Sequence, residues 1–420
     1  MPNKDKNIPK RRFKEFENAD AWELRKLGEV IEKLKGGVSI APNDYIEDGY
    51  RTIPKGAVND TGVADMSACK NVSVDFFEKN YFSKTSTGEL ITSLRDLVPS
   101  APNLGRIVRI VGQFEEFIMP QGVYSLKITD NLLEDFLIAY SNNYIYRSVI
   151  QSEKNGSTQV HIRNGEFLNI KIQVPSLPEQ EAIGNFFSTL DRHITLHQRK
   201  LDKLKSVKQA YLSEMFPAEG ERVPKRRFPG FTDAWELRKL GEVADIIGGG
   251  TPSTSNSEFW DGDIDWYTPA EIGEQIYVDG SERKITQLGL DKSSATLLPA
   301  NKTILFTSRA GIGKTAILRS DATTNQGFQS IIVDNNTEPY FIFSMTDKIK
   351  NKAISVASGS TFAEISSRAL GQLEFMFPSI NEQKAIGTFF STLDQHITLH
   401  QRKLEKLKNL KKALLNELFV

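Results

Sequence analysis

The sequence contains a single cysteine, Cys69, among 420 residues. It can therefore form neither an internal disulfide nor a cysteine-rich zinc site, which suits the reducing cytoplasm. It also lacks any run of about 18 apolar residues that could cross a membrane. The charged segment 1–16 has no apolar centre of the kind found in secretion signals. These absences predict a cytoplasmic protein rather than a membrane-bound or secreted one.

Neither sign of charge predominates, because 53 lysines and arginines balance 53 aspartates and glutamates. A protein that coats DNA through charge alone is usually clearly basic. If this chain binds DNA, it must gather its Lys and Arg locally or share the phosphate contacts with a partner. The hydrophobic content of 39% is sufficient for two domains, each with its own core.

Motifs of enzymes that act on DNA are missing as well. Pro-Pro does not occur, so the chain lacks the Asn-Pro-Pro-aromatic motif of base-amino methyltransferases, and no acidic cluster with a lysine indicates metal-dependent cleavage. Residues 309–315 (RAGIGKT) end like a phosphate-binding loop, but Ser308 stands where that loop needs a glycine. We interpret the segment as a polar turn between strands, or as a turn whose Arg309 and Lys314 face DNA.

Four of the five histidines form two pairs with helical spacing, His193 with His197 and His396 with His400. Such pairs bind zinc in metalloproteases, but neither pair has the adjacent glutamate of that motif. His197 and His400 fall at equivalent places in a predicted helix seam, where a polar residue typically sets the register. We therefore expect a structural role for them and no metal site.

Two segments of the chain occur twice. Residues 20–30 (DAWELRKLGEV) recur unchanged as residues 233–243, and both copies are preceded by Arg-Arg-Phe and a second phenylalanine. Residues 174–216 recur as residues 377–419, with 30 of 43 aligned positions identical. The chain is thus an internal duplication of a constant frame.

Each copy of the second repeat predicts one long helix. Both copies begin with a capping box, Ser176 to Glu179 and Ser379 to Glu382. Apolar residues then follow at spacings of four and three, as in a coiled coil, so we expect the two helices to bury each other's seams. The centre of the seam comprises Ile194, His197, Leu201 and Leu204 in the first copy and Ile397, His400, Leu404 and Leu407 in the second.

The segments between the repeats share little beyond a Gly-Gly pair. Both read as mixed α/β, because short β-rich runs alternate with Gly, Pro, Asn and Asp turns. These runs are residues 106–111, 169–174, 302–307 and 329–333. We predict an α+β chain divided into a first mixed α/β domain (14–175), a first long helix (176–216), a linker (217–227), a second mixed α/β domain (228–376) and a second long helix (377–420).

Equivalent frames predict a pseudo-two-fold axis, and antiparallel pairing of the helices would place the two domains at opposite ends. A helix of about 40 residues spans on the order of 60 Å. Equivalent major-groove faces of duplex DNA repeat about every 34 Å, so such a rod could set the spacing of two half-sites. Unlike domains would then recognise unlike half-sites.

The repeated helical segment PSLPEQEAIGNFFSTLDRHITLHQRKLDKLKSVKQAYLSEMF resembles the specificity (S) subunit of type I restriction-modification systems. The likeness extends over nearly the whole chain: RRFPGFTDAWELRKLGEV, GGGTPS, FWDGDIDWYTP, LFTSRAGIGKTAI and NQGFQSI all resemble patterns of that family in the family's order. The first domain has the Gly-Gly pair and Gln121-Gly122 but no counterpart to GDIDW.

The resemblance implies a non-catalytic DNA-binding subunit that reads a bipartite asymmetric sequence, one half-site with each target-recognition domain. It implies two methyltransferase (M) subunits as partners, which use S-adenosylmethionine to methylate adenine. Motor-nuclease (R) subunits, which use ATP and Mg, would add cleavage of unmethylated DNA. No cofactor and no metal are expected on this chain.

Candidate DNA-contacting residues follow from side chains that can bond bases or phosphates. In the first domain they are Arg51, Lys55, Asn59, Ser93, Arg95 and Gln121. In the second they are Thr251, Ser253, Trp266, Thr268, Arg309, Lys314, Gln326 and Gln329. We expect no catalytic residue among them.

Three other interpretations remain open from the sequence. A stand-alone bipartite DNA-binding regulator would share the fold but need no methyltransferase partner. An ATP- or metal-using enzyme could be built on residues 313–315 or on the histidine pairs. A scaffold could use the coiled coil only to join proteins.

Overall fold

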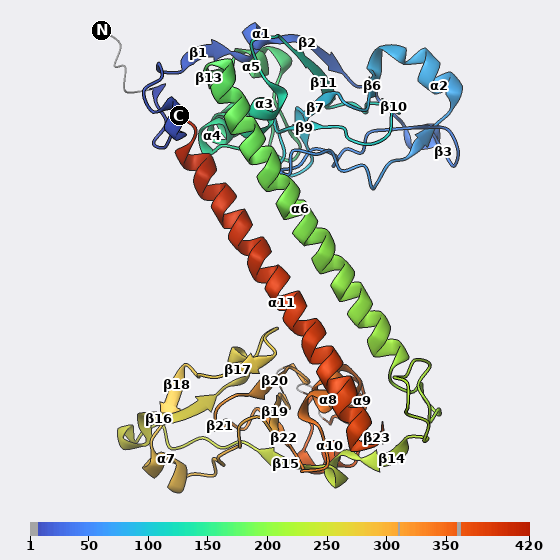
Figure 1. Cartoon of the computed structure of the whole chain (residues 1–420), viewed down its shortest axis with the longest axis vertical. Coiled ribbons are helices and arrows are strands. Elements are labelled where there is room, and N and C mark those ends of the chain that lie inside the picture. Colours follow the sequence, from blue (N-terminus) through green and yellow to red (C-terminus); the bar gives the residue numbers. More distant parts are fainter. Residues whose placement is uncertain (1–6, 310, 359–362) are drawn as a thin grey trace. The chain divides into compact units, whose positions relative to one another are not determined.

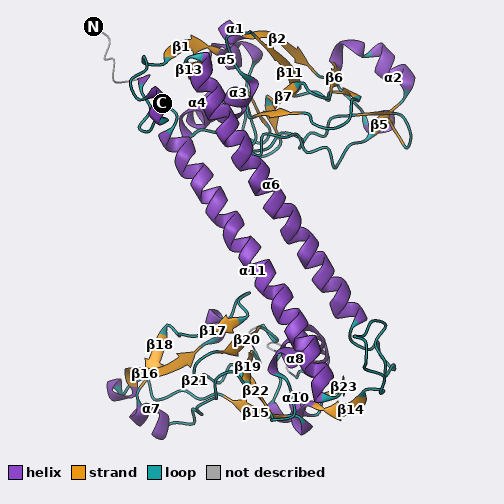
Figure 2. Cartoon of the chain, in the orientation of Figure 1, coloured by secondary structure: helices purple, strands orange, loops and turns teal. Residues whose placement is uncertain are grey.

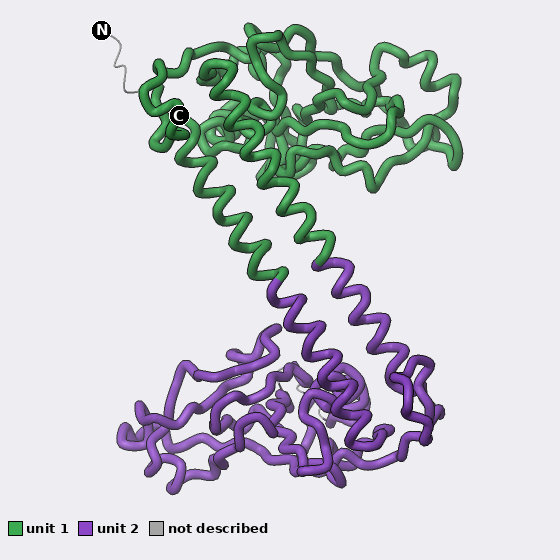
Figure 3. The backbone as a smooth tube through the Cα atoms, in the orientation of Figure 1, with its two compact units in different colours: residues 1–200, 400–420 green, residues 201–399 purple. Residues whose placement is uncertain are grey.

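The computed structural model describes residues 7–309, 311–358 and 363–420. The chain forms two compact units, shown in two colours in Figure 3. Unit 1 combines the chain up to Lys200 with His400–Val420, and unit 2 is the continuous segment Leu201–Leu399. Each unit therefore contains one mixed α/β domain and a part of both long helices. Figure 2 shows the helices, strands and loops of the chain in three colours.

The two long helices are α6 (Leu177–Glu214) and α11 (Ile380–Glu417), each of 38 residues (Figure 1). In unit 1 the first part of α6 packs against the last part of α11, and Asp191 pairs with Lys411. In unit 2 the last part of α6 packs against the first part of α11, and Lys208 pairs with Asp394. Contacts thus run in opposite chain directions within each unit, which confirms the predicted antiparallel pairing.

The starts of the two helices differ from the predicted capping boxes. Ser379 still accepts a hydrogen bond from the backbone N–H of Glu382, at 3.4 Å. The carboxylates of Glu179 and Glu382, however, form two-point ion pairs with Arg12 and Arg227, at 2.6–2.7 Å. The segment that precedes each mixed domain is therefore held to the start of a long helix by a half-buried arginine.

The mixed domain of unit 1 is built on a four-stranded antiparallel sheet in the order β2-β11-β7-β9. Helix α3 packs against the edge strand β9, and a two-stranded ribbon of β1 and β13 joins the domain to the frame. The bounds are β1 (Glu23–Lys26), β2 (Ile31–Gly36), β7 (Leu90–Ser93), β9 (Ile107–Arg109), β11 (Val123–Ile128), β13 (Lys171–Val174), α3 (Glu134–Tyr140) and α4 (Tyr144–Glu153).

Smaller elements fill the rest of this domain. They are α1 (Leu27–Val30), β3 (Tyr45–Ile46), β4 (Tyr50–Arg51), β5 (Asn71–Val72), α2 (Val74–Lys79), β6 (Lys84–Ser86), β8 (Arg95–Asp96), β10 (Glu116–Ile118), β12 (Val160–His161) and α5 (Asn164–Asn169). Short 3-10 turns at Lys14–Phe16, Pro42–Asp44 and Tyr81–Ser83 connect some of them.

The mixed domain of unit 2 has a five-stranded sheet in the order β15-β22-β19-β20-β17, with a second sheet β18-β16-β21 beside it. The ribbon β14-β23 joins it to the frame. The strands are β14 (Glu236–Lys239), β15 (Ala244–Gly248), β16 (Trp260–Tyr267), β17 (Tyr277–Val278), β18 (Arg283–Ile285), β19 (Thr303–Phe306), β20 (Thr315–Leu318), β21 (Ala322–Thr324), β22 (Gln329–Val333) and β23 (Glu374–Phe377). The helices are α7 (Gln287–Asp291), α8 (Pro339–Ser344), α9 (Thr346–Val356) and α10 (Ser367–Gly371).

The two domains contain sheets with the same strand order, a likeness that their sequences do not reveal. The order β2-β11-β7-β9 in unit 1 corresponds to β15-β22-β19-β20 in unit 2, with β17 added at the edge. The ribbons correspond too, since Glu23 pairs with Val174 and Glu236 with Phe377. All four β-rich runs expected from the sequence contain a strand, and the predicted fold class, with two mixed α/β domains alternating with two long helices, is confirmed.

Each unit buries an equivalent aromatic cluster where the frame meets the domain. In unit 1 the ring of Phe419 lies 5.7 Å from that of Phe187 and 6.1 Å from that of Trp22. In unit 2 Phe216 lies 6.2 Å from Phe390 and 6.0 Å from Trp235. Both cores thus depend on a phenylalanine just beyond the end of a long helix.

No helix in the described part of the chain is long and apolar enough to cross a membrane.

Candidate nucleic-acid interface

Three motifs that lie far apart in the sequence meet in unit 2. The Gly-rich loop after β15 is bonded to the segment after β21, since the N–H of Gly250 donates to the Thr324 carbonyl at 2.8 Å. The hairpin between β19 and β20 joins the same segment, because the N–H of Ser308 donates to the Gly327 carbonyl at 2.8 Å. The loops that carry the predicted DNA-contacting residues therefore form one surface region.

The segment 309–315 is the loop of this hairpin, not a phosphate-binding loop. The Thr307 hydroxyl donates to the Gly311 carbonyl at 2.7 Å and accepts from the N–H of Lys314 at 2.9 Å. Gly313 has a φ of +87°, which a side chain would strain. A strand follows the loop, whereas a phosphate-binding loop leads into a helix. Of its seven residues, Ala310 lies outside the described part.

Several candidates of unit 2 present their polar groups at this surface. Arg309, Lys314, Gln326 and Ser253 are exposed. The side-chain oxygen of Gln326 accepts from the Thr251 hydroxyl at 2.7 Å, which orients both side chains. These residues stay predictions as DNA contacts.

Other candidates of unit 2 are engaged within the domain. Trp266 is 4% exposed, and its indole N–H donates to the Gly250 carbonyl at 2.8 Å. It cannot reach a base edge from the interior, so we no longer place it among the contacts; it holds the Gly-rich loop. The hydroxyl of Thr268 donates to the Glu271 carboxylate at 2.9 Å, and Thr268 is the N-cap of the short 3-10 turn Pro269–Glu271. Gln329 lies half-buried in β22 beside Gly248.

The candidates Arg95 and Gln121 in unit 1 occupy the places that Arg309 and Gln326 occupy in unit 2. The N–H of Leu94 donates to the Gly122 carbonyl at 2.9 Å, just as that of Ser308 donates to Gly327. Each arginine follows the donating residue, and each glutamine precedes the accepting glycine. The Arg95 guanidinium reaches the Gln121 side-chain oxygen at 3.4 Å. Two unlike sequences therefore present an Arg and a Gln at equivalent positions.

The remaining candidates of unit 1 are placed differently. Lys55 is exposed. Arg51 pairs with Glu115 at 2.9 Å, so its charge is offset within the domain. Ser93 is 5% exposed and donates to the Arg95 carbonyl at 2.6 Å, which removes it from the surface. We therefore no longer place Ser93 among the contacts.

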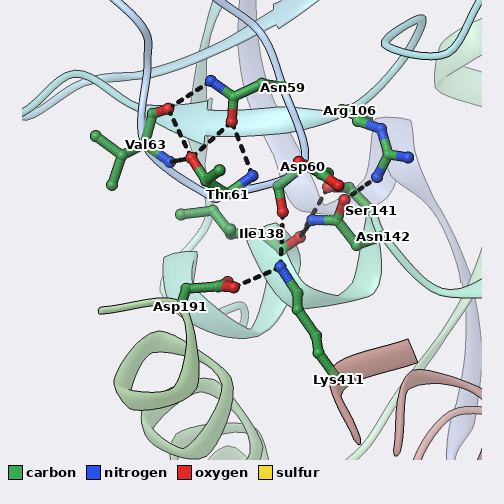
Figure 4. Close-up of polar contacts among 10 residues, drawn as sticks. All are labelled: Asn59, Asp60, Thr61, Val63, Arg106, Ile138, Ser141, Asn142, Asp191 and Lys411. Carbon is green, nitrogen blue, oxygen red and sulfur yellow. Dashed lines mark hydrogen bonds and ion pairs between the residues drawn. The ribbon is translucent and has the colours of Figure 1, made fainter. Parts of the chain in front are cut away.

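Asn59 organises a turn that is fastened to the frame (Figure 4). Its side-chain oxygen accepts from the N–H of Thr61 at 2.8 Å, and its amide donates to the Val63 carbonyl at 2.9 Å. The next carbonyl, that of Asp60, accepts from the Lys411 ammonium at 2.6 Å. Lys411 also pairs with Asp191 at 2.5 Å, and burial raises the pKa of Asp191 to about 6. The Asn59 side chain is thus occupied in shaping the turn.

The helix seam brings its two histidines together. The Nδ1 atoms of His197 and His400 lie 2.9 Å apart, with one ring donating to the other. Their apolar neighbours Ile194, Leu201, Ile397 and Leu404 are buried, whereas Leu204 and Leu407 are half-buried. Burial lowers the pKa of His197, and the charges of neighbouring His and Lys side chains lower it further. Within the described residues, no three His, Cys, Asp or Glu side chains are grouped to hold a metal ion.

One exposed cation was missed from the sequence. The Arg283 guanidinium stacks on the Trp260 ring at 3.8 Å, and Trp260 packs at a right angle on Trp266. The indole N–H of Trp260 donates to the Ser253 carbonyl, so the same pair of indoles supports Arg283 and the Gly-rich loop. Nothing in the sequence marks this arginine, because its stacking partner lies in another strand.

Comparison with known proteins places these features in context. The family model of the type I restriction modification DNA specificity domain matches residues 19–206 and again residues 232–409. The type I restriction enzyme MjaIX specificity subunit of Methanocaldococcus jannaschii is 35% identical over 194 residues, which are 44% of this chain and 44% of that protein. The putative MjaX specificity subunit of the same organism is 21% identical over 426 residues, covering 98% of this chain and 96% of that one.

A solved structure gives the same picture of the fold. The crystal structure of a type I restriction-modification S subunit from M. genitalium matches with a TM-score of 0.66 at 17% identity. The match covers 98% of this chain and 99% of that one. The duplicated arrangement of mixed domains and long helices is therefore shared along the full length.

Proposed function

Because this chain belongs to the family of type I restriction-modification DNA specificity subunits, we propose that it reads a bipartite, asymmetric DNA sequence and directs partner subunits to that site. Each mixed domain would recognise one half-site. Specificity subunits are in general non-catalytic, and on this proposal adenine methylation and ATP-dependent cleavage belong to the partners. The chain itself would hold no S-adenosylmethionine, ATP or Mg, and it would act in the cytoplasm.

The observation that carries the proposal is the repeated Arg and Gln pair in unlike domains. Arg95 and Arg309 follow the equivalent strands β7 and β19, and Gln121 and Gln326 precede the equivalent strands β11 and β22. Both side chains can bond base edges in the major groove, Arg to guanine and Gln to adenine. The loops around each pair differ in length and chemistry, so each domain would recognise different bases.

Exposed leucines on the two long helices support the proposal that the chain binds two copies of one partner. Leu196 of α6 and Leu399 of α11 are each 47% exposed, although burying a leucine side chain would stabilise the protein. Their helical neighbours one turn away are identical in the two copies, His193 and Lys200 in one, His396 and Lys403 in the other. The chain therefore presents the same exposed patch twice, as two methyltransferase subunits would require, and motor-nuclease subunits would join this complex.

The test is to co-express the chain with the methyltransferase subunit of its host and to map methylated adenines on genomic DNA. We expect one asymmetric motif with a fixed gap that disappears when this chain is omitted. Methylation without the chain, or failure of the two proteins to co-purify, would contradict the proposal and favour a stand-alone DNA-binding regulator.

A further inference from the structure

The loop between β8 and β9 of unit 1 has two exposed apolar side chains. We call residues 97–104 the tip loop; it follows directly after Arg95 and Asp96. Leu97 is 56% exposed and Val98 is 45% exposed. Two adjacent apolar side chains at the start of this surface loop are thus accessible to a ligand.

Hydrogen bonds from α4 and from Lys154, the residue that follows it, hold the backbone of the tip loop. Lys154 donates to the Pro99 carbonyl at 2.8 Å, and Gln151 donates to the carbonyls of Ser100 and Ala101 at 3.1 and 3.2 Å. Arg147 donates to the carbonyls of Ala101, Pro102 and Leu104. Arg147 and Gln151 lie on one face of α4 because they are four positions apart, and Lys154 follows the helix as its C-cap.

Two further side chains complete this support. Arg106 donates to the Pro102 carbonyl at 2.8 Å. Asp96 accepts from the N–H groups of Val98 and Asn103, at 3.2 and 3.4 Å, and so closes the loop. The loop carbonyls are therefore turned toward the domain, while Leu97 and Val98 are left at the surface.

The support places two half-buried guanidinium groups beneath the loop, those of Arg106 and Arg147. Neither Arg106 nor Arg147 forms an ion pair with a carboxylate of the described residues. Burial, together with the neighbouring charge of Arg106, lowers the pKa of Arg147 to about 10. Burial lowers the pKa of Arg106 as well. The charges of Asp60 and Asp96 offset those of Arg106 and Arg147 only in part. Burying guanidinium groups outside an ion pair costs free energy, and a loop that served only as a connection would not require it.

The equivalent hairpin of unit 2 is closed in a different way. There the Thr307 side chain and two glycines close the loop, and the exposed side chains are the cations Arg309 and Lys314. The same position of the shared sheet therefore carries a polar, cationic loop in one unit and a rigid, apolar loop in the other.

We propose that the tip loop enters the DNA major groove and that Leu97 and Val98 recognise the C5 methyl group of thymine in the first half-site. This inference rests on the proposed function. Thymine's methyl is the one apolar group that the base pairs present in the major groove, and aliphatic side chains contact it. The cations beneath the loop favour the approach of phosphates. Because the loop is already fixed, little conformational entropy is lost on binding.

The experiment uses the complex of the full chain with its methyltransferase partner and duplexes that contain the mapped target. Each thymine of the two half-sites is replaced in turn by deoxyuridine, which lacks only the methyl group. We expect at least one replacement in the half-site of the first domain to weaken binding about four-fold, the effect of one buried methyl-sized group. Leu97→Ala should abolish this difference between thymine and uracil.

The matched control is Leu288→Ala, since Leu288 is also an exposed leucine, 42% accessible, but lies in unit 2. It should retain the full sensitivity to uracil. Arg309→Ala, which acts in the second domain, identifies the other half-site. Leu97 and Leu288 are both exposed, so thermal unfolding should be unchanged in the two variants.

The outcomes separate the two proposals. Specific binding of the bipartite target with no response to uracil at any position would overturn the role of the tip loop and leave the proposed function intact. An unchanged response in Leu97→Ala would overturn it as well. Absence of any sequence-specific binding would instead contradict the proposed function.

Discussion

Units 1 and 2 repeat the same contacts in the frame and use different contacts in the domains. Arg12 binds Glu179 and Arg227 binds Glu382 through the same pair of bonds. The aromatic clusters at Phe419 and Phe216 correspond as well. Sequence identity in the frame thus reflects a shared set of contacts.

The units differ where a domain contacts the ion pair between the two long helices, Asp191–Lys411 in unit 1 and Asp394–Lys208 in unit 2. In unit 1 the lysine of that pair, Lys411, also binds a backbone carbonyl of the domain. In unit 2 it is the aspartate, Asp394, that gains a second partner, the Tyr340 hydroxyl at 2.9 Å. Equivalent ion pairs in the two units therefore contact unlike domains through different groups, the lysine ammonium in unit 1 and the aspartate carboxylate in unit 2.

The largest effect is expected from the arginines of the frame that pair with the buried Glu179 and Glu382. Arg12→Ala leaves Glu179, whose side chain is 1% exposed, without its cation. We expect a loss of about 3–5 kcal/mol in the free energy of unfolding of unit 1. Arg227→Ala should cost unit 2 a similar amount. Urea denaturation measures both, with Arg25→Ala, from an exposed ion pair, as a control below about 1 kcal/mol. Losses that differ strongly between the units would show that the frame contacts of the two units are not equivalent.

A second pair of variants tests the difference at the central ion pair. Lys411→Met removes the cation that pairs with Asp191, and we expect a loss of about 2–3 kcal/mol. Lys208→Met should cost less, because Asp394 keeps the hydrogen bond from Tyr340. Adding Tyr340→Phe to Lys208→Met should remove that advantage. Equal losses in the two single variants, measured by urea denaturation, would contradict the distinction.

The repeated Arg and Gln pair predicts effects on DNA binding that are confined to one half-site each. Arg95→Ala and Arg309→Ala should each weaken binding by about 1–3 kcal/mol, and each should relax discrimination at a different half-site. Competition between duplexes with single base changes measures this. If either variant lost affinity equally for random DNA, that arginine would be a phosphate contact only.

The smallest effect concerns His197 and His400, which form the contact common to both helix copies. The pKa of His197 is below its usual value, so folding favours the neutral ring. The stability that the neutral ring contributes is present above about pH 6.5 and is lost as the pH falls through the lower folded-state pKa. Unfolding measured from pH 7.5 to 5 should show this loss in the wild type and a weaker one in His197→Gln. Identical pH profiles would exclude the histidine pair as the cause.

The frame could be predicted from the sequence because its signals are local. The long helices follow from heptad spacing within one segment, and the buried positions Ile194 and Leu404 follow from the same pattern. The partners of Glu179 and Glu382 could not be predicted in this way. A capping box also explains each glutamate, whereas the arginines that bind them lie more than 150 positions away.

The domains were less predictable because their contacts join distant turns. Trp266 has the side chain of a DNA-contacting residue, but it is buried and bonds Gly250, 16 positions earlier. Ser93 ends a strand whose four residues are all buried, so the usual alternation of faces was no guide. The support of the tip loop joins residues 99–104 to α4, and no motif marks that face of the helix.

Phe419 has a further consequence for how the chain is made. It lies in the aromatic core of unit 1, against Trp22 and Phe187, yet the ribosome adds it after every residue of unit 2. Unit 2 is continuous in sequence and can close while synthesis is still under way, since domains fold as they emerge. Unit 1 must wait for residues 400–420. The first domain to be translated is thus the last to be completed.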